Sequence, residues 1–135
     1  MKYSEKTPSP DNFFELFETT GWNKKYELSK DQLYVALKNS WYSISVYYDV
    51  KLVGFGRIIS DGLVHALILD VIVLPELQGH GIGKFVMDKL LAKCKQHKVR
   101  DIQLFSARDK AGFYEKLGFS KRKEDAPGME MEKYW

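Results

Sequence analysis

The sequence has few of the features that mark secreted or membrane proteins. A single cysteine, Cys94, excludes an internal disulfide, and its place on the apolar side of a helical segment favours burial over reactivity. Residues 1–14 lack the apolar core of a secretory signal, and no apolar run approaches the roughly 20 residues that span a bilayer. These absences predict a cytoplasmic protein with no membrane partner.

An excess of charge of one sign is also absent. The net charge is +3, and lysines alternate with acids except in residues 93–100, where cations complement the dipole of a helix C-terminus. Nucleic-acid binding would need a broader basic face with interleaved aromatic residues, so no nucleic-acid partner is expected. The length of 135 residues and the hydrophobic content of 44% suit one core, which predicts a single domain over residues 1–135.

The N-terminal half predicts two helices followed by a sheet. Ser9 is an N-cap candidate with Pro10 at the first helical position, and Ser29 and Gln32 have capping-box spacing at the start of a second helix. The helical side-chain pattern ends before residues 41–74. In this segment β-branched and aromatic residues dominate, and turn residues divide it. This pattern predicts a three-stranded antiparallel meander.

The C-terminal half predicts a crossover helix and short closing elements. After the meander, an apolar i, i+4 row predicts a helix that lays one face on the sheet. The row consists of Ile82, Val86, Leu90 and Cys94. A strand within residues 100–107, a compact helix over 110–117 and terminal strands at 119–122 and 129–135 follow. The sequence therefore predicts an α+β fold with a mixed central β-sheet flanked by helices.

Three alternate glycines, Gly79, Gly81 and Gly83, connect the last strand of the meander to this helix. Glycine is costly at the start of a helix unless another group must approach the backbone closely. The amides of such a turn include the unpaired donors of a helix N-terminus, which suit an anion through hydrogen bonds and through the helix dipole. The turn is therefore a candidate phosphate site.

Two common nucleotide motifs do not fit the spacing of this turn. A Walker loop needs glycine where Gln78 stands and Ser or Thr where Phe85 stands. A dinucleotide fingerprint needs glycine where Lys84 stands and a tighter link to the preceding strand. Both motifs are excluded.

The residues that remain resemble the Gcn5-related N-acetyltransferase family. Gln78, Gly81 and Gly83 match its acetyl-CoA signature, "DVIVLPELQ" resembles its cofactor-binding strand, and "KAGFYEKLGF" resembles its later helix with a tyrosine. Together these segments extend over residues 43–121 in the order of the family's elements. The resemblance implies acetyl-CoA as the co-substrate and no metal.

The resemblance also implies which residues hold acetyl-CoA. The backbone of the last strand of the meander would pair with the pantetheine arm like an added strand, and the amides of the glycine turn would hold the pyrophosphate. The expected cofactor-binding residues are Val71, Ile72, Val73, Gln78, Gly79, His80, Gly81, Ile82, Gly83 and Lys84.

Tyr114 and Asp70 are the expected catalytic residues. Tyr114 matches the family tyrosine near the cofactor sulfur, where a phenol of pKa about 10 can protonate the departing thiolate. Its helical spacing with apolar neighbours is also typical of a packing residue. Asp70 is the one acid inside an apolar strand, where burial disfavours its charge and favours a role as base. Alternatively, Asp70 has a purely structural role, and His65 or a water molecule is the base.

The acceptor is indicated by a departure from the commonest family pattern. Ala107 stands where many relatives carry Asn, and "ARDKAGFY" resembles the small arylalkylamine-type subgroup. This resemblance implies direct attack by the primary amine of a small molecule, and a homodimer. Acetylation of protein or peptide lysine and a non-catalytic acyl-CoA-binding sensor are the alternatives. The expected aromatic walls of the acceptor pocket are Trp22, Tyr26, Trp41, Tyr47 and Tyr48.

Overall fold

The computed structural model describes residues 1–132. The chain forms two compact units, one ending at Leu104 and the other beginning at Phe105. Among the described residues, no helix is both long enough and apolar enough to cross a membrane.

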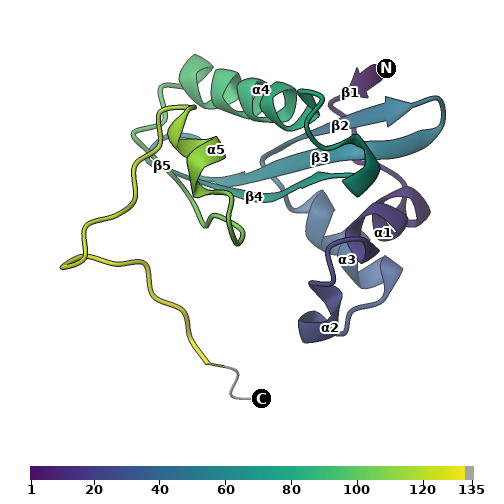
Figure 1. Ribbon diagram of the computed structural model, residues 1–135, viewed down its shortest axis with the longest axis horizontal. Coiled ribbons are helices and arrows are strands. Elements are labelled where there is room, and N and C mark those ends of the chain that lie inside the picture. The colour runs from purple at the N-terminus through teal and green to yellow at the C-terminus, as the bar shows by residue number, and fades with distance from the viewer. Residues whose placement is uncertain (133–135) are drawn as a thin grey trace. The chain divides into compact units, whose positions relative to one another are not determined.

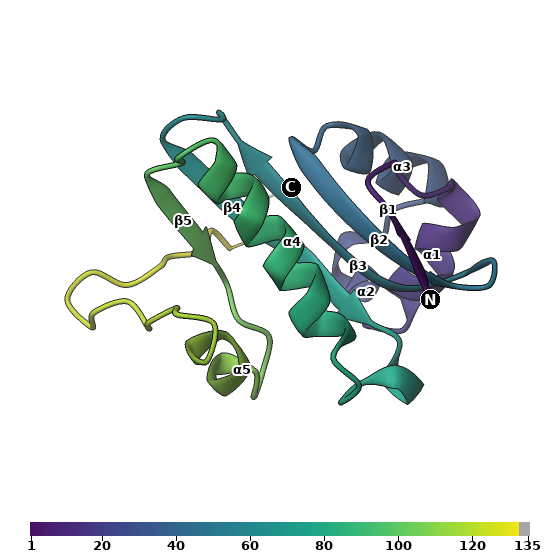
Figure 2. The same cartoon turned by 90° about the horizontal axis from the view of Figure 1, so that it is seen from above.

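The first unit is built around a five-stranded sheet with strand order β1-β2-β3-β4-β5 (Figure 2). The strands are β1 (Lys2–Ser4), β2 (Tyr42–Tyr48), β3 (Lys51–Ser60), β4 (His65–Val73) and β5 (Asp101–Leu104). The pairs β1–β2, β2–β3 and β3–β4 are antiparallel, whereas β5 runs parallel to β4. The predicted mixed sheet and meander are confirmed, and β1 is an additional strand that the sequence pattern did not predict.

Three helices lie on one side of this sheet (Figure 1). They are α1 (Pro10–Glu18), α2 (Asn23–Tyr26) and α3 (Lys30–Lys38). The predicted caps are present, because the Ser9 side chain accepts the Asn12 amide at 3.1 Å and Ser29 forms a capping box with Gln32. Local hydrogen-bonding chemistry therefore sets the starts of α1 and α3. The short helix α2 was not predicted.

The apolar side of α1 packs on the sheet. Phe13, Leu16 and Phe17 are buried, and the Phe13 ring lies 5.0 Å from the ring of Phe55 on β3 in an edge-to-face arrangement. Aromatic pairs of this kind add about 0.5–1.5 kcal/mol to the stabilisation from burial. The contact places α1 over the middle of β3.

Helix α4 (Ile82–Gln96) covers the opposite face, as Figures 1 and 2 show. All four residues of its predicted apolar row are buried, and burial raises the pKa of the Cys94 thiol. Glycines on β3 allow the helix to lie close to the sheet. A Cβ atom at Gly54 or Gly56 would lie 2.6 Å from a methyl group of Ile82 or Val86, respectively. Ile82, the first residue of α4, thus lies against Gly54, whose partner Val73 is the last residue of β4.

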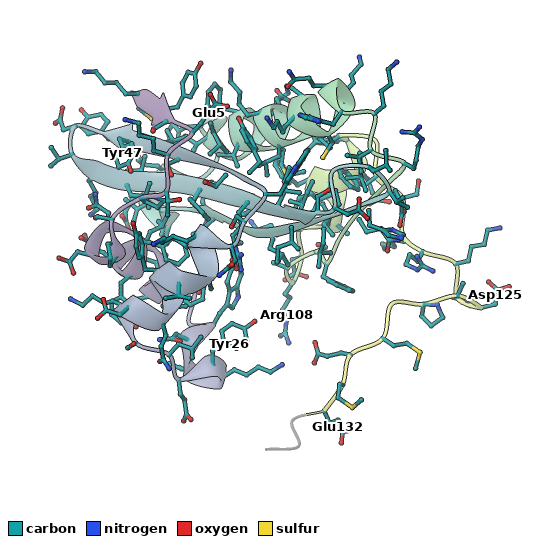
Figure 3. The ribbon with its side chains drawn as sticks, turned by 180° about the vertical axis from the view of Figure 1, so that it is seen from behind. Glu5, Tyr26, Tyr47, Arg108, Asp125 and Glu132 are labelled. Atoms are coloured by element: carbon teal, nitrogen blue, oxygen red, sulfur yellow. The ribbon has the colours of Figure 1, made fainter. Side chains whose placement is uncertain are left out.

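The second unit contains helix α5 (Ala111–Glu115) and an exposed segment. The predicted compact helix is confirmed, and it is followed by Gly118 with a φ of 102°. The predicted strands are not: residues 119–122 and 129–132 form no strand, and residues 133–135 lie outside the described part of the chain. Asp125 and Glu132 mark the exposed segment in Figure 3. Strand pairing is not local, so a short segment at the end of the chain cannot form a strand without a partner edge.

Candidate functional site

A β-bulge interrupts β4 at Asp70. Phe55 pairs with Ile72 and Arg57 pairs with Leu69, so Gly56 alone lies opposite two residues, Asp70 and Val71. Asp70 has a φ of 54°, a left-handed conformation that costs a non-glycine residue about 1–2 kcal/mol. Bulges of this kind bend a strand and redirect its side chains.

The bulge coincides with the point at which β4 loses its neighbour. Pairing between β4 and β5 extends from His65 to Ile68 and stops there. Among the described residues, no strand pairs with Leu69–Val73 on the side of β5. An extended ligand could therefore take main-chain hydrogen bonds from Val71, Ile72 and Val73, as strand addition requires.

The glycine turn follows the 3-10 helix η1 (Pro75–Leu77), an element that the sequence pattern did not predict. Gly79 and Gly81 have φ values of 83° and 87°, which side-chain-bearing residues rarely adopt. A Cβ atom at either glycine would have no atom within 4 Å, so the space beside this backbone is open. The turn thus has the shape that close approach by a ligand requires.

The amides of this turn are free to bind an anion. Gly81 is the N-cap of α4 and supplies no side-chain hydrogen bond. In residues 1–132, the amides from Gly79 to Lys84 have no protein acceptor, whereas the Phe85 amide already donates to the Gly81 carbonyl at 3.0 Å. Several converging N–H groups at a helix N-terminus form a binding site for phosphate.

The polar side chains of the turn stabilise it or point along α4. Gln78 Nε2 donates to the Val73 carbonyl at 3.3 Å, which ties the turn to the end of β4. His80 Nδ1 lies 3.2 Å from the Leu77 carbonyl oxygen. Lys84 Nζ forms an ion pair with Asp88 at 2.7 Å on the helix surface. The main chain, more than these side chains, is available to a ligand.

Asp70 is held by an arginine that the sequence pattern did not single out. Arg57 Nε donates to Asp70 Oδ2 at 2.7 Å, and the two side chains are 12% and 20% exposed. One carboxylate oxygen of Asp70 is therefore engaged in an ion pair. The catalytic role of Asp70 stays a prediction.

His65 lies at the opposite end of β4 from the glycine turn. Its Nδ1 is 2.9 Å from Asp101 Oδ2, and its side chain is 71% exposed. Five residues of strand correspond to roughly 16 Å, which separates His65 from the bulge at Asp70. The structure does not bring His65 and Asp70 together.

Tyr114 is a buried residue of α5. Its ring lies 5.0 Å from the Phe113 ring and 6.2 Å from the Phe119 ring, both in edge-to-face arrangements. Burial raises the pKa of the Tyr114 phenol above its ordinary value of 10.0. The phenol is therefore protonated at neutral pH, as a proton donor must be.

The five aromatic residues expected around the acceptor do not form one cluster. Trp22 and Tyr26 lie 6.1 Å and 6.5 Å from Phe17 in the helical layer. Trp41 instead contacts His97, the residue that follows α4 on the other side of the sheet, with ring centroids 5.0 Å apart. Tyr26 and Tyr47 are well separated in Figure 3. Composition indicated aromatic walls, but the sheet divides the residues between its two faces.

Comparisons with known proteins concern the family and the fold of the chain. A family model described as the acetyltransferase (GNAT) family matches residues 8–119, from α1 through α5. A solved structure of a probable acetyltransferase of unknown function from Staphylococcus aureus superposes with a TM-score of 0.81. It is 23% identical in sequence, and the superposition covers 98% of each chain.

Three relatives by sequence carry acetyltransferase names. An uncharacterized N-acetyltransferase of Pyropia yezoensis is 40% identical over 119 residues, which are 85% of this chain and 67% of that protein. A histone acetyltransferase of Glycine max is 34% identical over 125 residues, 84% of this chain and 53% of its own length. A chloroplastic serotonin N-acetyltransferase of Oryza sativa is 33% identical over 119 residues, with 85% of this chain and 58% of that protein covered. The chain thus spans 53% to 67% of these relatives.

Proposed function

Because the chain belongs to the GNAT family of acetyltransferases, we propose that it transfers the acetyl group of acetyl-CoA to the primary amine of a small molecule. Acetyl-CoA is the co-substrate of this family. One observation carries the proposal: an opened strand edge at Val71–Val73 is followed, after the short η1 segment, by the unpaired amides of Gly79–Lys84. The spacing suits a ligand with an extended arm and a pyrophosphate.

In the proposed complex, the two parts of the cofactor use two kinds of backbone. The pantetheine arm adds to the free edge of β4 through main-chain hydrogen bonds. The pyrophosphate binds the amides of the glycine turn, where the dipole of α4 adds a favourable interaction with negative charge. Gly79 and Gly81 permit the close approach that these bonds need.

The proposed chemistry is direct transfer. The amine nitrogen attacks the thioester carbonyl carbon, the C–S bond breaks, and the thiolate of CoA leaves. The nitrogen loses a proton and the sulfur gains one. We assign the second transfer to Tyr114, supported by its match to the family tyrosine and by a raised pKa that keeps its phenol protonated.

Water is favoured for the other proton. Oδ2 of Asp70 already accepts from Arg57, and His65 is remote from the bulge along β4. A water molecule or short water chain can accept the proton from an ammonium group without either side chain in direct contact. Asp70 remains the alternative base, and a comparison of Asp70→Asn with Arg57→Gln distinguishes the two.

The relatives support two acceptor classes. One is named a serotonin N-acetyltransferase and another a histone acetyltransferase, at 33% and 34% identity. We favour the small amine because "ARDKAGFY" resembles the arylalkylamine-type subgroup. Peptide lysine is the second candidate, on the name of the Glycine max relative. The homodimer and the cytoplasmic location remain predictions.

A panel of acceptors with acetyl-CoA tests the function. Release of free CoA thiol is followed with arylalkylamines, aliphatic diamines and lysine-containing histone peptides at equal concentrations. Faster release with an arylalkylamine than with any peptide supports the proposal, and the reverse order supports lysine acetylation. Tight binding of acetyl-CoA with no release above hydrolysis for any amine would indicate a sensor.

Tyr114→Phe tests the general acid, because it keeps the ring and removes only the hydroxyl. General acid catalysis contributes about 10²–10⁴-fold, and a thiolate is already a good leaving group, so the turnover number should fall about 10²-fold or less. The raised pKa predicts a wild-type rate that declines on the alkaline side only above about pH 10, and this decline should be absent in the variant.

The measurement is kcat against pH with saturating acceptor. Calorimetric titration with acetyl-CoA and the melting temperature serve as controls for binding and folding. If kcat is unchanged under conditions where chemistry limits the rate, Tyr114 is a packing residue only.

A further inference from the structure

The side chain of Arg57 connects three separate parts of the first unit. Besides its ion pair with Asp70 on β4, its Nη1 lies 3.3 Å from the Ala36 carbonyl oxygen in the last turn of α3. The same nitrogen lies 3.3 Å from Ser40 Oγ in the loop between α3 and β2. One planar guanidinium thus joins the bulge, a helix C-terminus and a loop.

Arginine is well suited to this connection. Its rigid fork donates several hydrogen bonds at fixed angles, whereas lysine has a single ammonium group. The carbonyl groups in the last turn of a helix attract cations, and the Asp70 carboxylate neutralises the half-buried guanidinium. Removal of either partner leaves the other as an uncompensated charge in a largely dry position.

The bulge gives this ion pair a geometric role. Regular alternation would place Asp70 on the α4 side with Ile68, which pairs with Ile58 in the buried core. The extra residue and the left-handed φ of 54° turn the Asp70 side chain toward Arg57. The same irregularity lies where β4 and β5 cease to pair.

We propose that Arg57 is a positioning residue that couples α3 to the opened part of β4. The inference rests on the proposed function in one respect: the opened part of β4 is where acetyl-CoA binds. Through Asp70, Arg57 holds the bulge in the geometry that exposes the strand edge. Through Ala36 and Ser40, it makes the stability of the end of α3 depend on whether a ligand is bound at that edge.

The first test uses binding alone. Amide hydrogen exchange is measured with and without saturating acetyl-CoA in the wild type and in Arg57→Gln. In the wild type, acetyl-CoA should slow exchange both in the glycine turn and in α3. In Arg57→Gln the slowing in the turn should persist, and the slowing in α3 should be lost.

Lys51→Gln is the matched control. Lys51 is also a β3 cation that reaches the helical layer, with its Nζ 3.6 Å from Glu15 Oε1, but both side chains are exposed and lie away from the bulge. This variant should keep the wild-type response in α3. Equal slowing of α3 exchange in Arg57→Gln and the wild type, or none in the wild type, would overturn the coupling.

The second test separates positioning from proton transfer. Arg57→Gln, Asp70→Asn and the double variant are compared in kcat, KM for the amine and the pH profile. If Arg57 and Asp70 act as one unit, each single variant should lose about 10–100-fold in kcat/KM, and the double variant should lose no more than either. The pH at which kcat/KM falls by half on the acidic side should be the same in all four proteins.

Other outcomes would reject the proposal. A much larger loss in Asp70→Asn than in Arg57→Gln, with the acidic limb removed, would identify Asp70 as the base. If the several fixed donors of the guanidinium are required, Arg57→Lys should recover less than half of the activity lost in Arg57→Gln. Full recovery would show that only the positive charge of Arg57 is needed. If acetyl-CoA binds but no amine reacts, the proposed function fails, and the exchange experiment still decides the coupling.

Discussion

Helices α1 and α3 satisfy their first amides in one way, and helix α4 does so in another. In α1 and α3, serine side chains accept those amides, and Gln32 completes a reciprocal capping box at α3. In α4, the N-cap is Gly81, which has no side chain to offer. The first amides of α1 and α3 thus have an acceptor within the protein, whereas those of α4 have none among the described residues.

The difference shows how the sequence separates structural and functional helix starts. A serine cap stabilises a helix by about 1 kcal/mol relative to alanine. Helix α4 lacks this contribution and depends on its packing against Gly54 and Gly56 of β3. Its free amides gain an acceptor only when a ligand binds, so ligand binding should directly stabilise the start of α4, and not the serine-capped starts of α1 and α3.

The largest expected effect is stabilisation by acetyl-CoA. A ligand that binds only the folded state at 100 times its Kd adds about 2.7 kcal/mol, which corresponds to a rise in Tm of about 5–10 °C for a chain of this size. Differential scanning fluorimetry with acetyl-CoA, CoA, ATP and NAD measures this shift. Stabilisation by ATP or NAD with none by CoA would contradict the assignment of the turn.

A smaller effect is expected for Gly81→Ala. Both Gly81 and Gly62 have strongly positive φ values, 87° and 78°, so alanine at either position should reduce folding stability by about 1–2 kcal/mol. Only alanine at Gly81 should place a methyl group where the pyrophosphate binds, with a loss in acetyl-CoA affinity of about tenfold or more.

Gly62→Ala is therefore the control for backbone strain in the calorimetric titration. Gly62 lies in the turn between β3 and β4, at the opposite end of β4 from the glycine turn. If the two variants bind acetyl-CoA with the same affinity, the conformation of the turn has only a structural role.

The smallest effect is expected for Ser9→Ala at the start of α1. Loss of the hydrogen bond from the Asn12 amide to the Ser9 hydroxyl should cost about 1 kcal/mol of unfolding free energy. Affinity for acetyl-CoA should not change. Denaturant unfolding with and without the ligand measures both quantities. A selective loss of affinity would break the distinction between the two kinds of helix start.

Elements stabilised by local interactions were predictable. The Ser9 and Ser29 caps depend on residues three positions away, and the buried row of α4 depends on i, i+4 spacing. The meander over residues 41–74 follows from side-chain period and turn residues. The short strand β1 was missed because its three residues carry too little pattern and depend on the edge of β2.

Predictions that depended on distant partners were less successful. A terminal strand was expected over residues 129–135, but Met129 and Met131 are 87% and 77% exposed and the described residues there form no strand. The expected aromatic wall included Trp41, which instead lies under Lys93 of α4 and beside His97 at the end of that helix. In both cases the outcome depended on a partner element that lies far away in the sequence, so the local side-chain pattern could not predict it.

The sequence by itself determined the capped helix starts, the strand periods and the glycine turn, because each depends on residues within about one helical turn or one strand of each other. Only the tertiary structure decided that β4 opens beyond Ile68 and that Asp70 pairs with Arg57, 13 residues away. It also decided that Arg57 reaches Ala36 across 21 residues. Such contacts form only after the sheet and helices have packed, so spacing along the chain does not reveal them.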